Sequence, residues 1–149
     1  MTPHKLIFTM QLKPATELLD GNLELIYPDG EPIDYLATSG CAGWQQPGDE
    51  WERGKGPIPQ GFDYEIPTRP YWSDTRGIEG LFFHITPDPV VSPGGRTRSE
   101  LGIHFDANLP GSAGCIVLRN RSGWEKFCQR MEAMARSGIK QIPLKVVYA

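Results

Sequence analysis

The residues best suited to covalent chemistry lie in the last third of the chain. His104 closes one apolar run, and Cys115 opens another after a segment rich in turn-forming residues. The two are eleven positions apart, which allows a tight loop to turn back and bring imidazole and thiol within hydrogen-bond reach. An imidazole so placed takes the thiol proton and creates a thiolate, which a free thiol with a pKa of about 8.5 supplies only sparsely at neutral pH. The spacing therefore predicts a cysteine nucleophile with a histidine base.

Two small residues just before the cysteine are expected to complete this site. Gly114 has no Cβ, so substrate can approach the backbone and the amides of Gly114 and Cys115 can face it. One such amide donor contributes about 3–4 kcal/mol to the stabilisation of an oxyanion in the transition state. Ser112 is expected to orient His104 or the substrate.

Charged residues around the loop are candidates to bind substrate. A guanidinium matches a carboxylate bidentately, and the chain carries one at Arg96, Arg98, Arg119 and Arg121, although such arginines are usually solvated surface residues. Asp106 begins the loop and is a candidate substrate contact, with turn formation as the alternative. His84 lies among apolar residues and is interpreted as structural.

A metal site is not expected. His104, Asp106, Cys115 and His84 have suitable ligand types, but the chain has no Cys-x-x-Cys or His-x-x-x-His pair. We expect neither a metal nor another cofactor.

Short apolar and β-branched runs predict the strands that must position these residues. The expected strands span residues 5–11, 23–27, 33–38, 62–66, 81–85, 101–104, 115–118 and 144–148. Pro28, Asp29 and Gly30 form a turn signal, so the second and third strands are expected to pair antiparallel. The runs at 101–104 and 115–118 are expected to be joined by a tight loop that turns back.

One principal helix is predicted near the C-terminus. Ser122 and Glu125 fit a capping box, which predicts a helix over 123–136 that stops at Gly138. Its apolar face consists of Trp124, Phe127, Cys128, Met131 and Ala135. Cys128 is therefore a predicted core residue. The chain as a whole is predicted to be a single, mostly β domain over residues 1–149.

The segment from Cys41 to Gln60 is rich in glycine and proline and has no sustained period, which predicts a long loop. A loop of this length is usually functional or mobile. Trp44 and Trp51 would shield a substrate if the loop is a lid, and plain surface packing is the alternative.

Composition narrows the classes of function. The formal net charge is −3, so no basic excess exists to neutralise a phosphate backbone and nucleic acid is not an expected partner. No apolar run approaches the roughly 18 residues that span a bilayer, so membrane insertion is not expected. The first ten residues lack the apolar stretch and cleavage site of a signal peptide. Three cysteines are an odd number, which does not favour a disulfide framework.

The loop and its surroundings resemble a known family. Ile103 and His104 followed by residues 110–116 (Pro-Gly-Ser-Ala-Gly-Cys-Ile) are similar to the signature of the YkuD-type L,D-transpeptidases. Residues 38–40 (Thr-Ser-Gly) and 56–66 resemble two upstream segments of that family, so the resemblance covers residues 37–118, roughly half of the chain.

The resemblance has two departures. Ala113 stands where the common family motif has histidine, which makes the stretch similar to a compact branch with Pro-Gly-(Ser/Thr)-x-Gly-Cys that includes toxins delivered by type VI secretion. Val117 stands where many members place Arg or Asn, and Arg119 or Arg121 would have to supply that charge.

The resemblance implies a β-sandwich or barrel-like fold and attack on peptidoglycan stem peptides, at the bond between the L-centre of a diamino acid and a D-residue. A thioester would form on Cys115. A second stem as acceptor gives a cross-link, a free D-amino acid gives exchange and water gives cleavage, and the sequence leaves these open.

The expected location follows from the substrate and the missing signal. The protein would be made in the cytoplasm and act at the cell wall or periplasm after delivery by another route, or as part of a virion. The alternative is a catalytically idle structural or binding module of a phage particle or secreted assembly.

Overall fold

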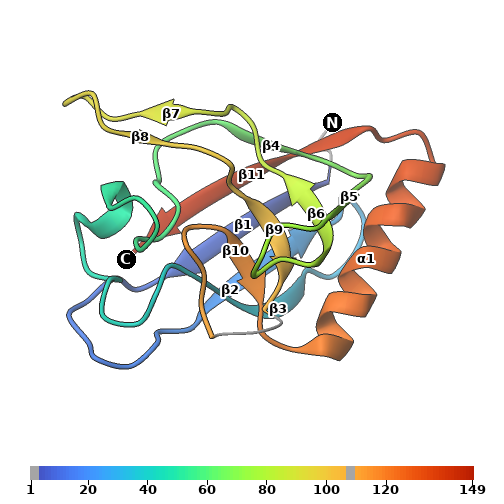
Figure 1. Cartoon of the computed structure of the whole chain (residues 1–149). Coiled ribbons are helices and arrows are strands. Elements are labelled where there is room, and N and C mark those ends of the chain that lie inside the picture. The colour runs from blue at the N-terminus through green and yellow to red at the C-terminus, as the bar shows by residue number, and fades with distance from the viewer. Residues whose placement is uncertain (1–3, 107–109) are drawn as a thin grey trace.

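The computed structural model describes residues 4–106 and 110–149. Its elements in chain order are β1 (Lys5–Met10), β2 (Gly21–Ile26), β3 (Ile33–Ser39), the short 3-10 helix η1 (Asp49–Trp51), β4 (Tyr64–Pro67), β5 (Tyr71–Ser73), β6 (Gly80–His84), β7 (Val90–Val91), β8 (Thr97–Arg98), β9 (Gly102–Phe105), β10 (Ile116–Leu118), α1 (Arg121–Arg136) and β11 (Gln141–Tyr148). The protein is mostly β with one principal helix near the C-terminus, as predicted (Figure 1).

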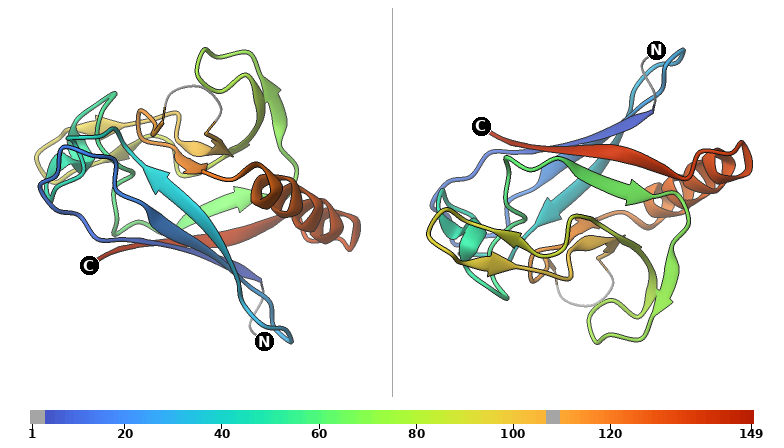
Figure 2. Two further views of the ribbon diagram at one scale, coloured as in Figure 1. Left: turned by 90° about the horizontal axis from the view of Figure 1, so that it is seen from below. Right: turned by 90° about the horizontal axis from the view of Figure 1, so that it is seen from above.

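Within the described part of the chain, nine strands form one sheet in the order β4-β11-β1-β2-β3-β10-β9-β6-β5, and β7 pairs with β8 separately. β1 is parallel to β11 and β9 is parallel to β10, while the other pairs are antiparallel. The sheet curls until β4 approaches β6 (Figure 2), where Glu65 and Thr86 exchange backbone hydrogen bonds of 2.8 and 3.0 Å. The curl gives the sheet an inner and an outer face.

The core lies inside the curl. Alternate residues of β1 and β2, such as Leu6, Phe8 and Leu23, are fully buried because successive side chains of a strand point to opposite faces. The helix α1 lies across β3, β9 and β10, and its Phe127 ring packs edge-on against Phe83 with centroids 5.4 Å apart. The buried helix residues are Trp124, Phe127, Met131 and Met134, and Cys128 is half-buried against this core.

The helix begins earlier than predicted and has a different cap. The Asn120 side chain accepts a hydrogen bond of 2.9 Å from the Gly123 amide, so Asn120 is the N-cap and the helix starts at Arg121. Ser122 lies inside the first turn and donates to Asn120 Oδ1, so the prediction of a capping box at Ser122 was wrong. The helix end is confirmed, because Gly138 has a φ of +98°, a left-handed conformation that glycine adopts without strain.

Each of the eight predicted strands is present, with bounds shifted by up to three residues. Three short strands, β5, β7 and β8, were not predicted. The expected pairing of β2 with β3 is confirmed, with Leu23 opposite Tyr35. The described residues include no helix that is both long enough and apolar enough to cross a membrane. All three cysteines are free thiols.

The connection between β9 and β10 differs from the prediction. The two strands are parallel neighbours, with Ile116 opposite Ile103, so the chain crosses back to the start of β9 before β10 begins. A hairpin would have set Cys115 beside the end of β9. The parallel register sets it beside the beginning instead.

Candidate active site

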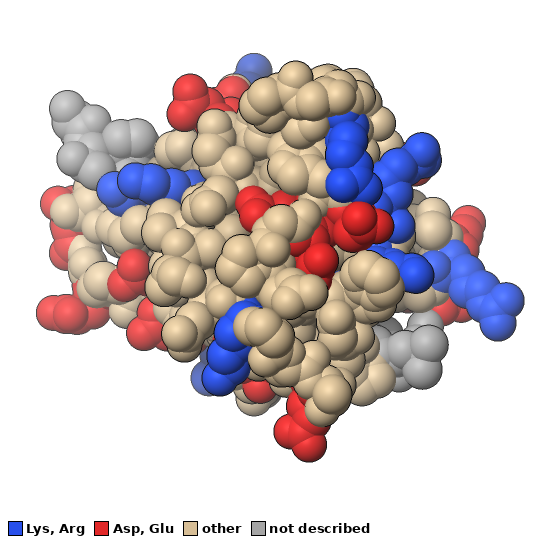
Figure 3. All heavy atoms as spheres, turned by 90° about the vertical axis from the view of Figure 1, so that its left-hand side faces the viewer, with Lys and Arg blue, Asp and Glu red and all other residues tan. Residues whose placement is uncertain are grey.

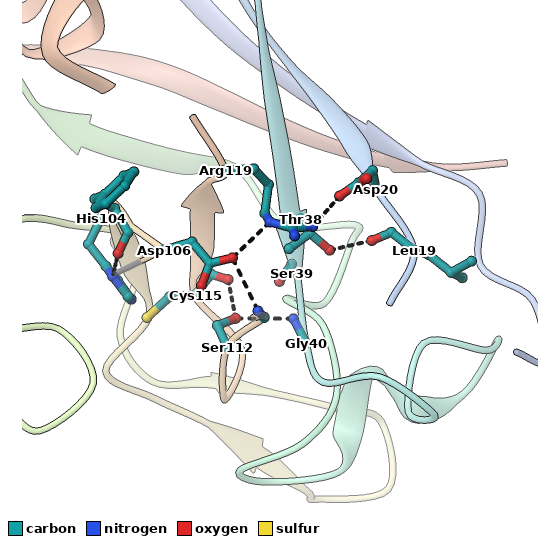
Figure 4. A network of polar contacts seen from close by, with 12 residues as sticks. Leu19, Asp20, Thr38, Ser39, Gly40, His104, Asp106, Ser112, Cys115 and Arg119 are labelled. Atoms are coloured by element: carbon teal, nitrogen blue, oxygen red, sulfur yellow. Dashed lines mark hydrogen bonds and ion pairs between the residues drawn. The ribbon is translucent and has the colours of Figure 1, made fainter. Parts of the chain in front are cut away.

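The sheet brings Cys115 and His104 onto one face. His104 in β9 pairs with Val117 in β10, so both side chains lie on the same face of the sheet. Cys115 comes two residues before Val117 and shares that face, which makes the thiol and the imidazole diagonal neighbours. Figure 4 shows the Cys115 sulfur directed toward the side on which His104 lies. Phe82 of β6 packs with Cys115 and Val117 in a small apolar cluster on this face.

The tautomer of His104 is set by the backbone. Its Nδ1 lies 2.9 Å from the Phe105 carbonyl oxygen, which can only accept, so Nδ1 donates and Nε2 keeps its lone pair. Burial lowers the pKa of His104 below 6.5, and the bond to Phe105 offsets part of this effect. At neutral pH the ring is therefore a neutral base with Nε2 as its basic atom.

Cys115 is a buried, protonated thiol in the resting structure. Burial raises its pKa to about 11, and the Gly102 amide and the Arg98 charge offset part of the rise. Its sulfur donates to the Glu100 carbonyl at 3.8 Å, and no hydrogen bond joins these two described side chains, Cys115 and His104. Catalytic hydrogen bonds are often long or absent before substrate binds. The pair is thus suited to proton transfer that accompanies attack.

Ser112 holds the backbone of the nucleophile (Figure 4). Its Oγ donates to the Cys115 carbonyl at 2.5 Å and accepts from the amides of Gly40 and Gly114 at 3.1 and 3.2 Å. All three partners are backbone groups. Ser112 therefore supports the site by fixing the loop that carries Cys115 against the end of β3.

Gly114 is required here for a reason that the sequence did not suggest. A Cβ on Gly114 would lie 2.1 Å from Nη2 of Arg98, and its φ of +140° disfavours other residues. The Gly114 amide donates to Ser112, so of the two amides expected to bind an oxyanion only that of Cys115 remains a candidate.

Three of the residues expected to contact substrate, Arg119, Arg121 and Asp106, lie outside the cleft. Arg119 forms an ion pair through Nε with Asp106 at 2.8 Å and a second one with Asp20 (Figure 4). Asp106 also accepts from the Gly111 amide at 3.2 Å, and burial raises the pKa of this carboxyl. Arg121 lies over the Phe105 ring, 4.5 Å from its centroid. These side chains stabilise the ends of the loop.

A cleft of about 1110 Å³ opens over the sheet face that carries Cys115. Its wall includes Cys115, His104, Ser112, Ala113, Phe82, His84, Asp88, Arg53, Arg76, Arg98, Glu100 and Tyr71. Phe82 stacks between two imidazoles, with centroids 6.0 Å from His104 and 6.3 Å from His84. His84 Nε2 lies 2.7 Å from Asp88 Oδ2, so His84 is tied to the cleft wall.

The 41–60 loop borders the cleft, but its two tryptophans do not line it. Cys41, Arg53 and Gly54 line the cleft, whereas the Trp44 ring lies beneath the Lys55 ammonium and is 37% exposed. The loop is anchored by Gln45, whose side-chain amide donates to the Ser39 carbonyl at 2.9 Å. On the end of the molecule that carries this loop, acidic and basic side chains both reach the surface (Figure 3).

No protein-family model matches the chain, and no curated protein or solved structure matches it significantly. Among residues 4–106 and 110–149, no group of three or more His, Cys, Asp or Glu side chains is arranged to hold a metal ion.

Proposed function

We propose that this protein is a cysteine acyltransferase of the L,D-transpeptidase type that acts on peptidoglycan stem peptides. The observation that carries the proposal is that Cys115 and His104 share one sheet face within a cleft, and that no described residue is hydrogen-bonded to Nε2 of His104. The motif resemblance over residues 37–118 supplies the substrate class.

Acylation begins when the carbonyl of the scissile peptide meets Cys115. The S–H bond breaks, its proton moves to Nε2 of His104, and the sulfur electron pair forms a bond to the carbonyl carbon. The Cys115 amide is the candidate donor for the charge that develops on the oxygen. When the peptide bond breaks, the imidazolium returns its proton to the leaving amine. The products are a thioester on Cys115 and a released D-residue.

Deacylation repeats these steps with an incoming nucleophile. The neutral His104 takes a proton from an amine or from water as it attacks the thioester, and the proton then returns to the sulfur. A stem-peptide amine gives a cross-link, a D-amino acid gives exchange and water gives hydrolysis. His104 serves all three, so the acceptor that reaches the cleft decides the product.

The charges on the cleft wall suit a zwitterionic peptide. Arg53 and Arg76 are exposed at the cleft and present guanidinium groups to substrate carboxylates. Glu100 also lines the cleft and is suited to the amine of a diamino acid. We assign carboxylate binding to Arg53 and Arg76 in place of Arg119 and Arg121, because the latter two point to other partners.

A second candidate function is a structural or binding module in which the chemistry is idle. The observation that favours it is the neutral, protonated Cys115, which donates to a carbonyl and not to His104. The similarity of residues 110–116 to secreted toxins supports delivery to the cell wall by a secretion system under the first proposal. A virion location is compatible with either candidate function.

The decisive experiment is mass spectrometry of a disaccharide-tetrapeptide incubated with the protein, with and without an added D-amino acid. Loss of the terminal D-residue indicates hydrolysis, and its replacement indicates exchange. A product with twice the substrate mass less one released D-amino acid indicates cross-linking. An acyl adduct on Cys115 should be trapped by rapid acid quenching. Unchanged substrate and an unmodified protein, in a sample whose fold is verified by circular dichroism, would refute the enzymatic proposal.

A further inference from the structure

Arg98 is a buried cation whose bonds all go to neutral groups. Its side chain in β8 is 3% exposed, yet no carboxylate among the described residues forms an ion pair with it. Nη1 donates to the carbonyls of Glu50 and Pro57, the latter at 3.1 Å. Nη2 donates to the carbonyls of Gly56 and Ala113 at 3.1 and 2.7 Å. These four bonds use the four N–H groups of Nη1 and Nη2, so they cannot also bind a substrate carboxylate.

A buried arginine without a carboxylate partner is unusual in a folded protein. Taking a guanidinium out of water is costly, and proteins usually offset the cost with a carboxylate partner. Carbonyl oxygens satisfy the hydrogen bonds of Arg98 but leave its positive charge uncompensated. A site that holds such a charge is suited to a negative charge that appears only during reaction.

The charge lies beside the backbone that leads into Cys115. A Cβ on Gly114 would be 2.1 Å from Nη2 of Arg98, so the guanidinium occupies the space beside the residue that precedes Cys115. Arg98 and Cys115 both line the cleft. The charge of Arg98 lowers the pKa of Cys115 and so offsets part of the rise that burial causes. Its field therefore favours the thiolate.

The same guanidinium joins two loops at the edge of the cleft. Three of its bonds go to residues 50–57, and the fourth goes to Ala113 in the loop that carries the nucleophile. Ser39 makes a parallel link, since its Oγ donates to the Gly114 carbonyl at 2.9 Å and accepts from the Ile58 amide at 2.9 Å. The backbone before Cys115 is thus held from both sides.

We propose that Arg98 is a positioning residue of this site, which fixes the loop of Cys115 through the Ala113 carbonyl and stabilises the thiolate through its charge. The inference rests on Cys115 being the nucleophile of the proposed function. In the step concerned, the thiol proton moves to Nε2 of His104, the electron pair stays on sulfur, and Arg98 keeps all of its protons.

The test measures how fast iodoacetamide alkylates Cys115 as a function of pH, by mass spectrometry of the Cys115 peptide. Three variants are compared with the wild type. Arg98→Gln removes both the charge and the planar guanidinium. Arg98→Lys keeps a charge but cannot donate to four carbonyls. Arg96→Gln is the matched control, because Arg96 lies two residues away, is exposed and pairs with Glu52 at 3.0 Å.

We expect the alkylation rate at a fixed pH below the midpoint to fall about tenfold to a thousandfold in Arg98→Gln, because losing an opposite charge near a titrating group raises its pKa by about one to three units. Arg96→Gln should match the wild type. A folded Arg98→Gln variant with the wild-type rate would overturn the role of the charge. Arg98→Lys tests whether the guanidinium positions the loop that carries Cys115. It also keeps the proposal testable if Arg98→Gln does not fold.

In Arg98→Lys we expect kcat on the muropeptide to fall at least tenfold with KM little changed, because the loop is misplaced while the substrate contacts remain. Wild-type kcat in that variant would overturn the positioning role. The alkylation experiment needs no peptidoglycan, so it separates the two proposals. If the alkylation of Cys115 depends on Arg98 but no muropeptide is turned over, the substrate class is rejected and the role of Arg98 is retained.

Discussion

Replacing Ser112 with alanine removes one hydroxyl that joins three backbone groups around the nucleophile. The variant leaves the Gly40 and Gly114 amides and the Cys115 carbonyl without the partner they have in the structure. A hydrogen bond contributes about 0.5–1.5 kcal/mol net, and a buried group left unpaired costs about 1–3 kcal/mol. Ser112 is half-buried, so water can replace part of what is lost.

The expected loss in the free energy of unfolding is therefore about 1.5–3 kcal/mol, on the scale of one to two fully lost bonds. For a chain of this size, each kcal/mol lowers Tm by about 2–4 °C, so Ser112→Ala should melt roughly 3–12 °C below the wild type. Urea denaturation followed by tryptophan fluorescence measures the free energy directly. The same variant should lose kcat, since the Cys115 backbone is no longer fixed.

The matched control is Ser122→Ala. Ser122 is exposed, and the one described partner of its hydroxyl is the Asn120 side chain at 2.8 Å, so the change should stay within about 0.5 kcal/mol of the wild type. If Ser112→Ala unfolds at the same urea concentration as Ser122→Ala and keeps wild-type kcat, the role assigned to the Ser112 hydroxyl is refuted.

Three further outcomes are expected. Cys115→Ala should abolish turnover of muropeptides with Tm little changed, because the sulfur acts chemically and its volume is small; measurable kcat in that variant would remove the central proposal. kcat/KM should rise as pH increases through the pKa of His104, which burial places below 6.5. It should then stay level through neutral pH and fall only near the Cys115 pKa of about 11. An acid limb centred above pH 7 would contradict the buried, neutral base. Trp44→Ala should leave KM within about twofold of the wild type, because an exposed side chain outside the cleft contributes little, and a large rise in KM would favour the lid.

Local patterns in the sequence were sufficient to predict the helix and the strands other than β5, β7 and β8. Alternating apolar residues mark β1 and β2, and the helical spacing of Trp124, Phe127 and Met131 marks α1. The direction of β10 relative to β9 was not predictable in this way, because an apolar run identifies a strand but not its neighbour or its direction. Asn120 was missed as the cap because Ser122 and Glu125 offered a competing pattern two residues later.

The chemistry at Cys115 and His104 could be proposed from local sequence, but the residues that support it could not. Arg119 reads as a free cation near the loop, and the structure pairs it with Asp20, 99 positions away. Arg98 lies in a proline- and glycine-rich segment without any period, and its burial depends on carbonyls more than 40 positions away. Contacts of that range leave no local pattern in a single sequence.

Burial favours the neutral forms of both Cys115 and His104, so the thiolate is not the resting form of the nucleophile. The pKa of Cys115 is about 11 and that of His104 lies below 6.5, so moving the proton from sulfur to nitrogen costs more than about 6 kcal/mol before the ions attract one another. Two unit charges about 4 Å apart recover about 4 kcal/mol at an effective dielectric constant of 20. The ion pair is then disfavoured by at least about 2 kcal/mol, which leaves it as a minor species of a few per cent at most. Proton transfer is therefore expected to accompany attack on the substrate carbonyl, when the negative charge passes from sulfur to an oxygen that the Cys115 amide can stabilise. A cleft arranged in this way protects the thiol from small electrophiles at rest and activates it only when a carbonyl is in place.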